Sequence, residues 1–302
     1  MSAEQQYIDL FTQHEDIVRR NAPECMNSLR TQAFADFQEA GFPSLKHEDF
    51  KHTDVARLFA PDYGLNINRF DVAVTPDDVF RCNVPDMRTH LFFVVNDTFH
   101  EDSETEMSLP DGVYAGSMNK FMEKYPEVAS RYYGKIAQTG GDGVTALNTM
   151  FVQDGFVFYV PRHVKLERTV QLVNIFRSMV DIMANRRILV IMEPYSEARL
   201  LVCDHSLDDV KCFSSQVIEI FAEEGAYFDY YDLEESTVST TRYSSLYVKQ
   251  EKQSNVLING ITLNNGVTRN NYYINMNGEY AEATLCGMAV QDKNQLVDTY
   301  SH

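Results

Sequence analysis

Residues 146–167 read ALNTMFVQDGFVFYVPRHVKLE and mark the point where the sequence changes character. Before this stretch the pattern predicts helices with a few strands, and after it almost only short strands and polar turns. Within it, Gln153-Asp154-Gly155 lies between two apolar runs, which is typical of a hairpin or a strand-turn-strand unit. We therefore expect an α-rich part before residue 145 and a β part after it.

The composition favours a folded protein with a large core. The chain has 302 residues, of which 44% are apolar and 12% aromatic, and this length suits one large domain or two. A net charge of −18 argues against nucleic acid or an anionic membrane as the main partner, because both attract clustered Lys and Arg. No apolar run reaches the roughly 18 residues of a membrane span, and the N-terminal residues lack the pattern of a signal peptide. We expect a cytoplasmic protein.

Helical signals dominate the first part of the chain. Residues 4–20 place apolar side chains near a period of 3.6, which predicts an amphipathic helix. Residues 23–40 begin with a proline suited to a first helical turn and are followed by a glycine suited to a helix end. A short buried strand is predicted at 91–95 and another helix near 117–129. Together these signals indicate an α-rich N-terminal domain over residues 1–138.

Short strands separated by polar turns fill the second domain, residues 144–302. Small residues follow turn signals at Ala198, Ala226, Ser254 and Ala281, in steps of 28, 28 and 27 residues. A repeat of this length favours a stacked solenoid, in which each coil buries its neighbour's apolar edge. A β-sandwich has similar short strands and stays open on the pattern alone. The predicted strands are residues 187–192, 199–203, 216–221, 227–231, 244–248, 255–261, 272–276 and 282–288.

Residues 146–167 resemble the A-x-N-x-x-F-x-x-D-G-x-x-x-Y-V-P-x-x-V-x-x-E hallmark of the SufB/SufD family of iron-sulfur cluster assembly proteins. Residues 41–53 resemble the family motifs G-x-P-[TS] and E-x-W-[KR]-x-T, with Phe50 in place of Trp. Asp97 stands in place of the glycine of a V-N-G-x-F motif. The N-terminal form resembles SufD more than SufB. Further matches, in family order, lie at residues 109–113, 268–271, 277–283 and 295–302.

The resemblance implies an α+β, mainly β fold, in which an α-rich N-terminal domain precedes a parallel β-helix, a single-stranded solenoid. It implies a SufD-like scaffold subunit of the SufBCD complex, which pairs with a SufB-like subunit, links to a SufC-like ATPase and is not an enzyme. No cofactor is expected in isolation, and a transient iron-sulfur cluster only in the complex. Family members continue beyond the equivalent of His302 into further coils and a helical domain that docks SufC. We therefore expect a C-terminally truncated relative with a weakened SufC contact, which can form a homodimer.

The cysteines offer few metal ligands. They are scattered and never form a C-x-x-C pair, which is poor material for a disulfide framework or a zinc site. Cys203 and His205 form the best local pair, because side chains two residues apart share a face of a strand. The preceding Leu200-Leu201-Val202 favours a buried structural thiol over a ligand. No catalytic or cofactor-binding residue is predicted, and the candidate metal ligands are Cys203, His205 and Cys286.

Two other functions remain as alternatives. A carbohydrate-active β-helix enzyme could use two carboxylates as acid and base, from Glu223 and Glu224 or from Glu234 and Glu235. Adjacent residues of a strand face opposite sides, however, so solvated turns explain these pairs better. An orphan β-helix dimerisation module is the third possibility, because exposed strand edges favour pairing.

Overall fold

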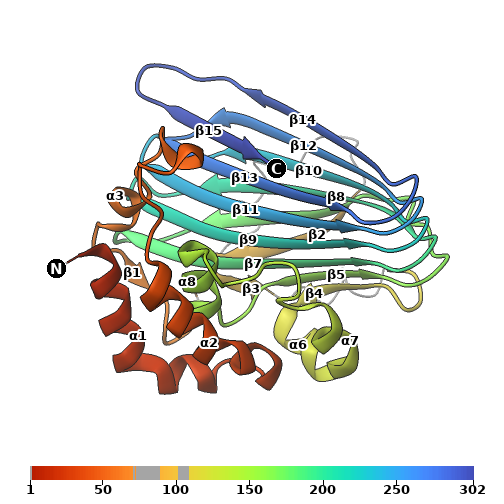
Figure 1. Cartoon of the computed structure of the whole chain (residues 1–302), viewed down its shortest axis with the longest axis horizontal. Helices are drawn as coiled ribbons and strands as arrows, with labels where there is room; N and C mark the ends of the chain where they lie inside the picture. The colour runs from red at the N-terminus through yellow and green to blue at the C-terminus, as the bar shows by residue number, and fades with distance from the viewer. Residues whose placement is uncertain (1, 71, 73–88, 101–108) are drawn as a thin grey trace.

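The structure is a computed structural model that describes residues 2–70, 72, 89–100 and 109–302. Two facing β-sheets form a parallel solenoid, and helices cover the outer face of one of them (Figure 1). The predicted fold, a parallel β-helix preceded by helices, is confirmed. No helix of the described residues is long and apolar enough to cross a membrane. The helices are α1 (Ala3–Arg20), α2 (Glu24–Ala40), η1 (Glu48–Phe50), α3 (Val55–Phe59), α6 (Met118–Lys124), α7 (Pro126–Tyr132) and α8 (Gly143–Phe151).

The chain alternates between the two sheets. Sheet A is the helix-covered one, and sheet B closes the other side of the lumen. Sheet A contains, in spatial order, β15 (Leu296–Ser301), β13 (Val267–Met276), β11 (Thr240–Gln250), β9 (Cys212–Ala222), β7 (Ile182–Met192), β5 (Phe156–Val160) and β4 (Tyr114–Ser117), and β1 (Gly64–Leu65) pairs with β7. Sheet B contains β14 (Glu282–Ala289), β12 (Asn255–Asn264), β10 (Tyr227–Glu235), β8 (Glu197–Ser206), β6 (Val170–Phe176), β2 (His90–Val95) and β3 (Thr98–His100).

The register of sheet B gives the length of each coil. Val170 aligns with Leu200, then Tyr230, Ile258 and Leu285, in steps of 30, 30, 28 and 27 residues. Neighbouring strands from β6 to β14 run parallel, which excludes the antiparallel sandwich that the pattern left open. All eight predicted strands lie within β7 to β14 and are shorter than the observed ones.

The same corner turn is repeated in successive coils. Ala226, Ser254 and Ala281 each donate a backbone N–H to the carbonyl three residues earlier, and the equivalent residue of the preceding coil is Ser196. The predicted marker Ala198 lies two residues further on, so the first step of the repeat is 30 residues rather than 28. The residue before each of these positions has a left-handed backbone, with φ between 57° and 66°: Tyr195, Gly225, Gln253 and Tyr280.

The apolar run before Gln153 is a helix, so the predicted hairpin or strand-turn-strand is wrong. Asp142 caps α8 by accepting hydrogen bonds from two backbone N–H groups, and every residue of the helix is buried. A segment that is apolar on all sides carries no periodicity to distinguish a buried helix from a buried strand. Gly155 serves close packing, because a Cβ there would lie 2.3 Å from the carbonyl oxygen of Arg187 in β7.

The other predictions for the first part of the chain largely hold. Helices α1 and α2 match the predicted residues 4–20 and 23–40 within one residue. The helix predicted near 117–129 is two helices, α6 and α7, which meet at Tyr125 before Pro126. The predicted strand 91–95 is part of β2, which pairs with β6 and so belongs to the solenoid.

Apolar side chains fill most of the lumen and both helix contacts. The lumen cluster runs from Phe92 in β2 to Ile258 and Tyr272 in the later coils. Helices α1, α2, α3 and α8 pack on sheet A through Met183, Phe213 and Tyr243, and a separate cluster joins α6 and α7 to β5, β7 and β9.

Candidate functional site

Cys203 and His205 lie together on the outer face of β8, as their spacing predicts. Their neighbours Val202 and Asp204 point into the lumen. Cys203 is 1% exposed and packs with Val173 in a small apolar cluster. The thiol therefore has the surroundings of a core cysteine, with an imidazole beside it.

His205 is held among polar groups. Burial lowers the pKa of its imidazole, but the hydrogen-bonded Cys203 and the carboxylates of Asp204 and Glu235 raise it, and the net direction is upward. The Nδ1 atom of His205 lies 4.0 Å from Oε2 of Glu235. This arrangement supports a thiol–imidazole pair that holds its proton more firmly than a free histidine would.

Cys286 is not part of this pair. It is exposed on β14 and aligns through Asn259 and Tyr231 with Leu201, so three strand spacings, about 14 Å, separate it from β8. In the part of the chain that the structure describes, no three His, Cys, Asp or Glu side chains are grouped to hold a metal ion. Two ligands, Cys203 and His205, leave a tetrahedral ion two open positions. Their metal role stays a prediction.

A cluster of buried charges in the lumen escaped the sequence reasoning. Arg186 and Arg242 project from sheet A, and Asp204, Asp232 and Glu234 from sheet B, all of them buried. Nη1 of Arg186 lies 2.8 Å from Asp204, whereas Arg242 pairs with Asp232 and lies 3.4 Å from Asp204 and 3.8 Å from Glu234. With all five ionised, the cluster carries one net negative charge.

Glu234 is the group of this cluster that titrates near neutrality. Burial raises its pKa to about 7, against the lowering effects of Arg242 and of the hydroxyl of Thr268, which donates to Oε2 at 2.8 Å. The sequence signal that could have revealed this cluster is a charged residue at a strand position whose side chain points into the lumen. Asp204 and Asp232 were missed because the predicted strands end at residues 203 and 231.

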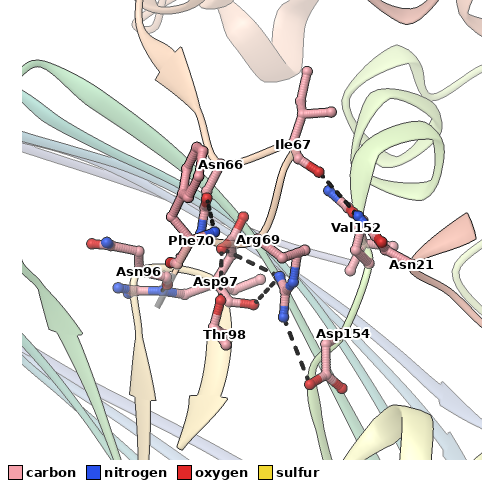
Figure 2. Close-up of polar contacts among 12 residues, drawn as sticks. Asn21, Asn66, Ile67, Arg69, Phe70, Asn96, Asp97, Thr98, Val152 and Asp154 are labelled. Atoms are coloured by element: carbon pink, nitrogen blue, oxygen red, sulfur yellow. Dashed lines mark hydrogen bonds and ion pairs between the residues drawn. The ribbon is translucent and has the colours of Figure 1, made fainter. Parts of the chain in front are cut away.

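A second buried cluster joins two of the sequence motifs (Figure 2). Arg69 lies between Asp97 and Asp154, with Nη1 3.0 Å from the backbone oxygen of Asp97 and Nη2 3.8 Å from Oδ2 of Asp154. Oδ1 of Asp154 also accepts from the Ser117 hydroxyl at 3.0 Å and from the N–H of Asn119 at 3.1 Å. Burial raises the pKa of both carboxyl groups and Arg69 opposes it. Asp154 of the hallmark motif therefore has a structural role, because its carboxylate contacts Arg69, Ser117 and Asn119.

The last coil that the structure describes is exposed. Strand β14 is exposed along its whole length, and β15 is largely exposed, because no described strand pairs with their outer edges. Both strands lie at one end of the solenoid (Figure 1). The large apolar side chains exposed at this end are Met276, Tyr280, Leu285, Met288, Val290 and Leu296.

Comparison with known families covers nearly the whole chain. Residues 1–172 match the SufBD protein N-terminal region, and residues 176–302 match the SufBD core domain of SUF system FeS cluster assembly. The chain belongs to the SufBD family. This SufBD chain is also similar to the iron-sulfur cluster assembly SufBD family protein ycf24 of Trieres chinensis, with 23% identity over 166 residues. The match covers 49% of the chain and 34% of that relative, so it spans about a third of the relative's length.

Both matched regions are named for the SufBD family, and the description of the second names SUF system FeS cluster assembly. Family membership also explains why the motifs occur in family order. The resemblance found in the sequence is therefore confirmed at the level of the family, while the choice between SufB-like and SufD-like roles belongs to the proposal below.

Proposed function

We propose that this SufBD protein is a SufD-like scaffold subunit without catalysis of its own, which pairs with a SufB-like subunit and links it to a SufC-like ATPase. The observation that carries the proposal is the match of residues 1–172 to the SufBD protein N-terminal region and of residues 176–302 to the SufBD core domain. The motifs at residues 41–53, whose form resembles SufD more than SufB, favour the SufD-like role. An iron-sulfur cluster would be transient cargo of that complex, and the cytoplasmic location stays a prediction.

Coexpression with the SufB-like and SufC-like proteins of the same source, followed by affinity purification, tests this proposal. We expect the SufB-like subunit to copurify with the wild-type chain. Recovery of neither partner by the wild-type chain would refute the role.

Exposed strand edges also favour a homodimer when no SufB-like subunit is present. Multi-angle light scattering of the purified chain measures this directly. A dimer mass supports self-pairing, and a monomer at high micromolar concentration excludes it.

The carboxylate pairs do not favour a carbohydrate-active enzyme. Glu234 and Glu235 lie on β10 and Glu234 is buried, so the solvated turn expected for this pair is wrong. Glu234 points into the lumen and Glu235 outward, as neighbours on a strand do. Glu223 accepts from the hydroxyl of Tyr132 at 3.0 Å, and Glu224 accepts from a different tyrosine. Neither adjacent pair faces a common substrate position.

A further inference from the structure

The charged cluster of the lumen belongs to a wider polar layer, which the scaffold role leaves unexplained. One aligned row of this layer lies on sheet A and consists of Arg186, Gln216, Ser244 and Asn270. A second aligned row lies on sheet B and consists of Asn174, Asp204, Glu234 and Thr262. Each of these residues lies an even number of positions from an apolar side chain of the lumen cluster on the same strand, so both rows point inward. The rows face each other, because Arg186 reaches Asp204 across the lumen at 2.8 Å.

Several polar atoms of this layer and of its neighbours on β10 have no hydrogen-bond partner among the residues that the structure describes. The donors are Nδ2 of Asn174, Nη2 of Arg186 and Nε2 of Gln216. The acceptors are Oε1 of Gln216, Oδ1 of Asp232 and Oδ1 of Asn270, and the hydroxyl of Tyr230 can serve as either. None of these residues is more than 7% exposed. Buried polar groups in folded proteins are almost always hydrogen-bonded, so we expect a bound species to supply the missing bonds.

That species must both donate and accept hydrogen bonds. An anion would satisfy only the donors, and a cation would satisfy only the acceptors. Gln216 presents both kinds of atom on one amide group. Water donates and accepts, and a buried water typically makes about three hydrogen bonds to polar groups of this kind.

The spacing of the rows suits one water between adjacent coils. Neighbouring strands lie about 4.8 Å apart, and a water at about 2.9 Å from each of two groups spans that distance. Small side chains also lie beside the long ones. Ala184 and Ser214 are the preceding inward residues of β7 and β9, and Ser244 stands between Gln216 and Asn270 in the row of sheet A.

We propose that the lumen binds a file of ordered water molecules along this polar layer, from β6 to β13. The waters hydrate the buried charges of Arg186, Arg242, Asp204, Asp232 and Glu234. Burying a charge costs less free energy when each of its polar atoms keeps a hydrogen bond. The polar layer is therefore a water-binding site, enclosed by the apolar side chains that fill the rest of the lumen.

Deuteron magnetic relaxation dispersion of the full chain tests the proposal in solution, because it counts water molecules that exchange more slowly than the protein tumbles. Gln216→Leu changes the volume of the side chain little and removes both amide atoms, so it should lower this count. Gln38→Leu is the control, because Gln38 is an exposed residue of α2, and it should leave the count unchanged. Equal counts in the wild type and in Gln216→Leu would overturn the water file.

A crystal structure of the wild-type chain tests the same site without a variant. We expect water density within about 3.2 Å of the Gln216 amide and of Oδ1 of Asp232. Direct hydrogen bonds among these side chains with no water between them, or a larger bound molecule, would overturn the proposal.

Urea unfolding adds a measurement that separates a hydrated amide from a dry one. A hydrated Gln216 has its hydrogen bonds satisfied, so Gln216→Leu should lower the urea midpoint. Removing a dry, unsatisfied amide would raise the midpoint, and that result would contradict the water file.

Discussion

At the scale of single residues, Glu234 has the clearest physical consequence. It is a buried carboxyl group beside Asp204 and Asp232, and the single guanidinium of Arg242 pairs with all three acids. The pKa of Glu234 is raised from an ordinary 4.5 to about 7, first by burial. The folded protein therefore binds a proton that the unfolded chain releases between pH 4.5 and 7, and the stability contribution of this group falls as the pH rises through that window.

Glu234→Gln should remove this loss of stability at higher pH, because a glutamine side chain does not ionise. We expect the variant to be more stable than the wild type at pH 8, by up to about 3 kcal/mol for 2.5 pH units, and similar to it at pH 4.5. Urea unfolding across the pH range measures the difference. Glu279→Gln, at an exposed position, is the control and should follow the wild type. A parallel pH dependence in Glu234→Gln would contradict the assignment.

A second residue-scale prediction concerns the ion pair between β7 and β9. Arg187 and Glu219 are fully buried, 2.6 Å apart, and Glu219 also accepts N–H groups of Gly134, Ile136 and Ala137. Glu219→Gln leaves the buried guanidinium without its counter-charge and should cost about 3–5 kcal/mol of unfolding free energy.

Chemical denaturation measures that loss. Glu235→Gln, whose carboxylate is half exposed, should stay within about 0.5 kcal/mol of the wild type. A loss below about 1 kcal/mol for Glu219→Gln would show that the loop at residues 134–137 does not depend on this carboxylate.

At the scale of elements, the sequence predicts helices and strands whose apolar residues recur at a regular period, and it does not predict elements that are buried on all sides. Helix α1 shows an apolar stripe against solvent, so its bounds are found within one residue. Helix α8 has no solvent face and was mistaken for a strand. Each corner turn contains a residue with a left-handed backbone conformation. The sequence does not reveal these positions, because Tyr195, Gln253 and Tyr280 are not residues typical of that conformation.

Gly225 is the corner position where substitution has the largest expected effect. Its φ is 66°, and a Cβ there would lie 2.5 Å from the ring of Tyr195 in the preceding coil. Gly225→Ala should lower the free energy of unfolding by about 1–3 kcal/mol. Gly141→Ala is the matched control, because its φ is 80° and no atom lies within 4 Å of the added Cβ, so it shows the backbone strain alone and should lose less stability. Equal stability of both variants would contradict the stacked corner.

At the scale of the whole molecule, family motifs and periodicity predict the solenoid. They do not predict the contacts between segments that are distant in the sequence. The steps of 28 and 27 residues are present in the later coils because each strand must align with its neighbour. The contacts of Arg69 with Asp154 and of Phe50 with Arg269 depend on how helices and coils close in space. Of the predicted site, only Cys203 and His205 are brought together, because strand spacing fixes that pair and not the distance to Cys286.

Native mass spectrometry of the complex formed on coexpression with the SufB-like subunit tests the central claim most directly. The account predicts a complex that contains both chains, because a scaffold subunit acts by pairing with its SufB-like partner. Free SufB-like subunit beside a monomer or homodimer of this chain, at concentrations where both are folded, would contradict the scaffold role.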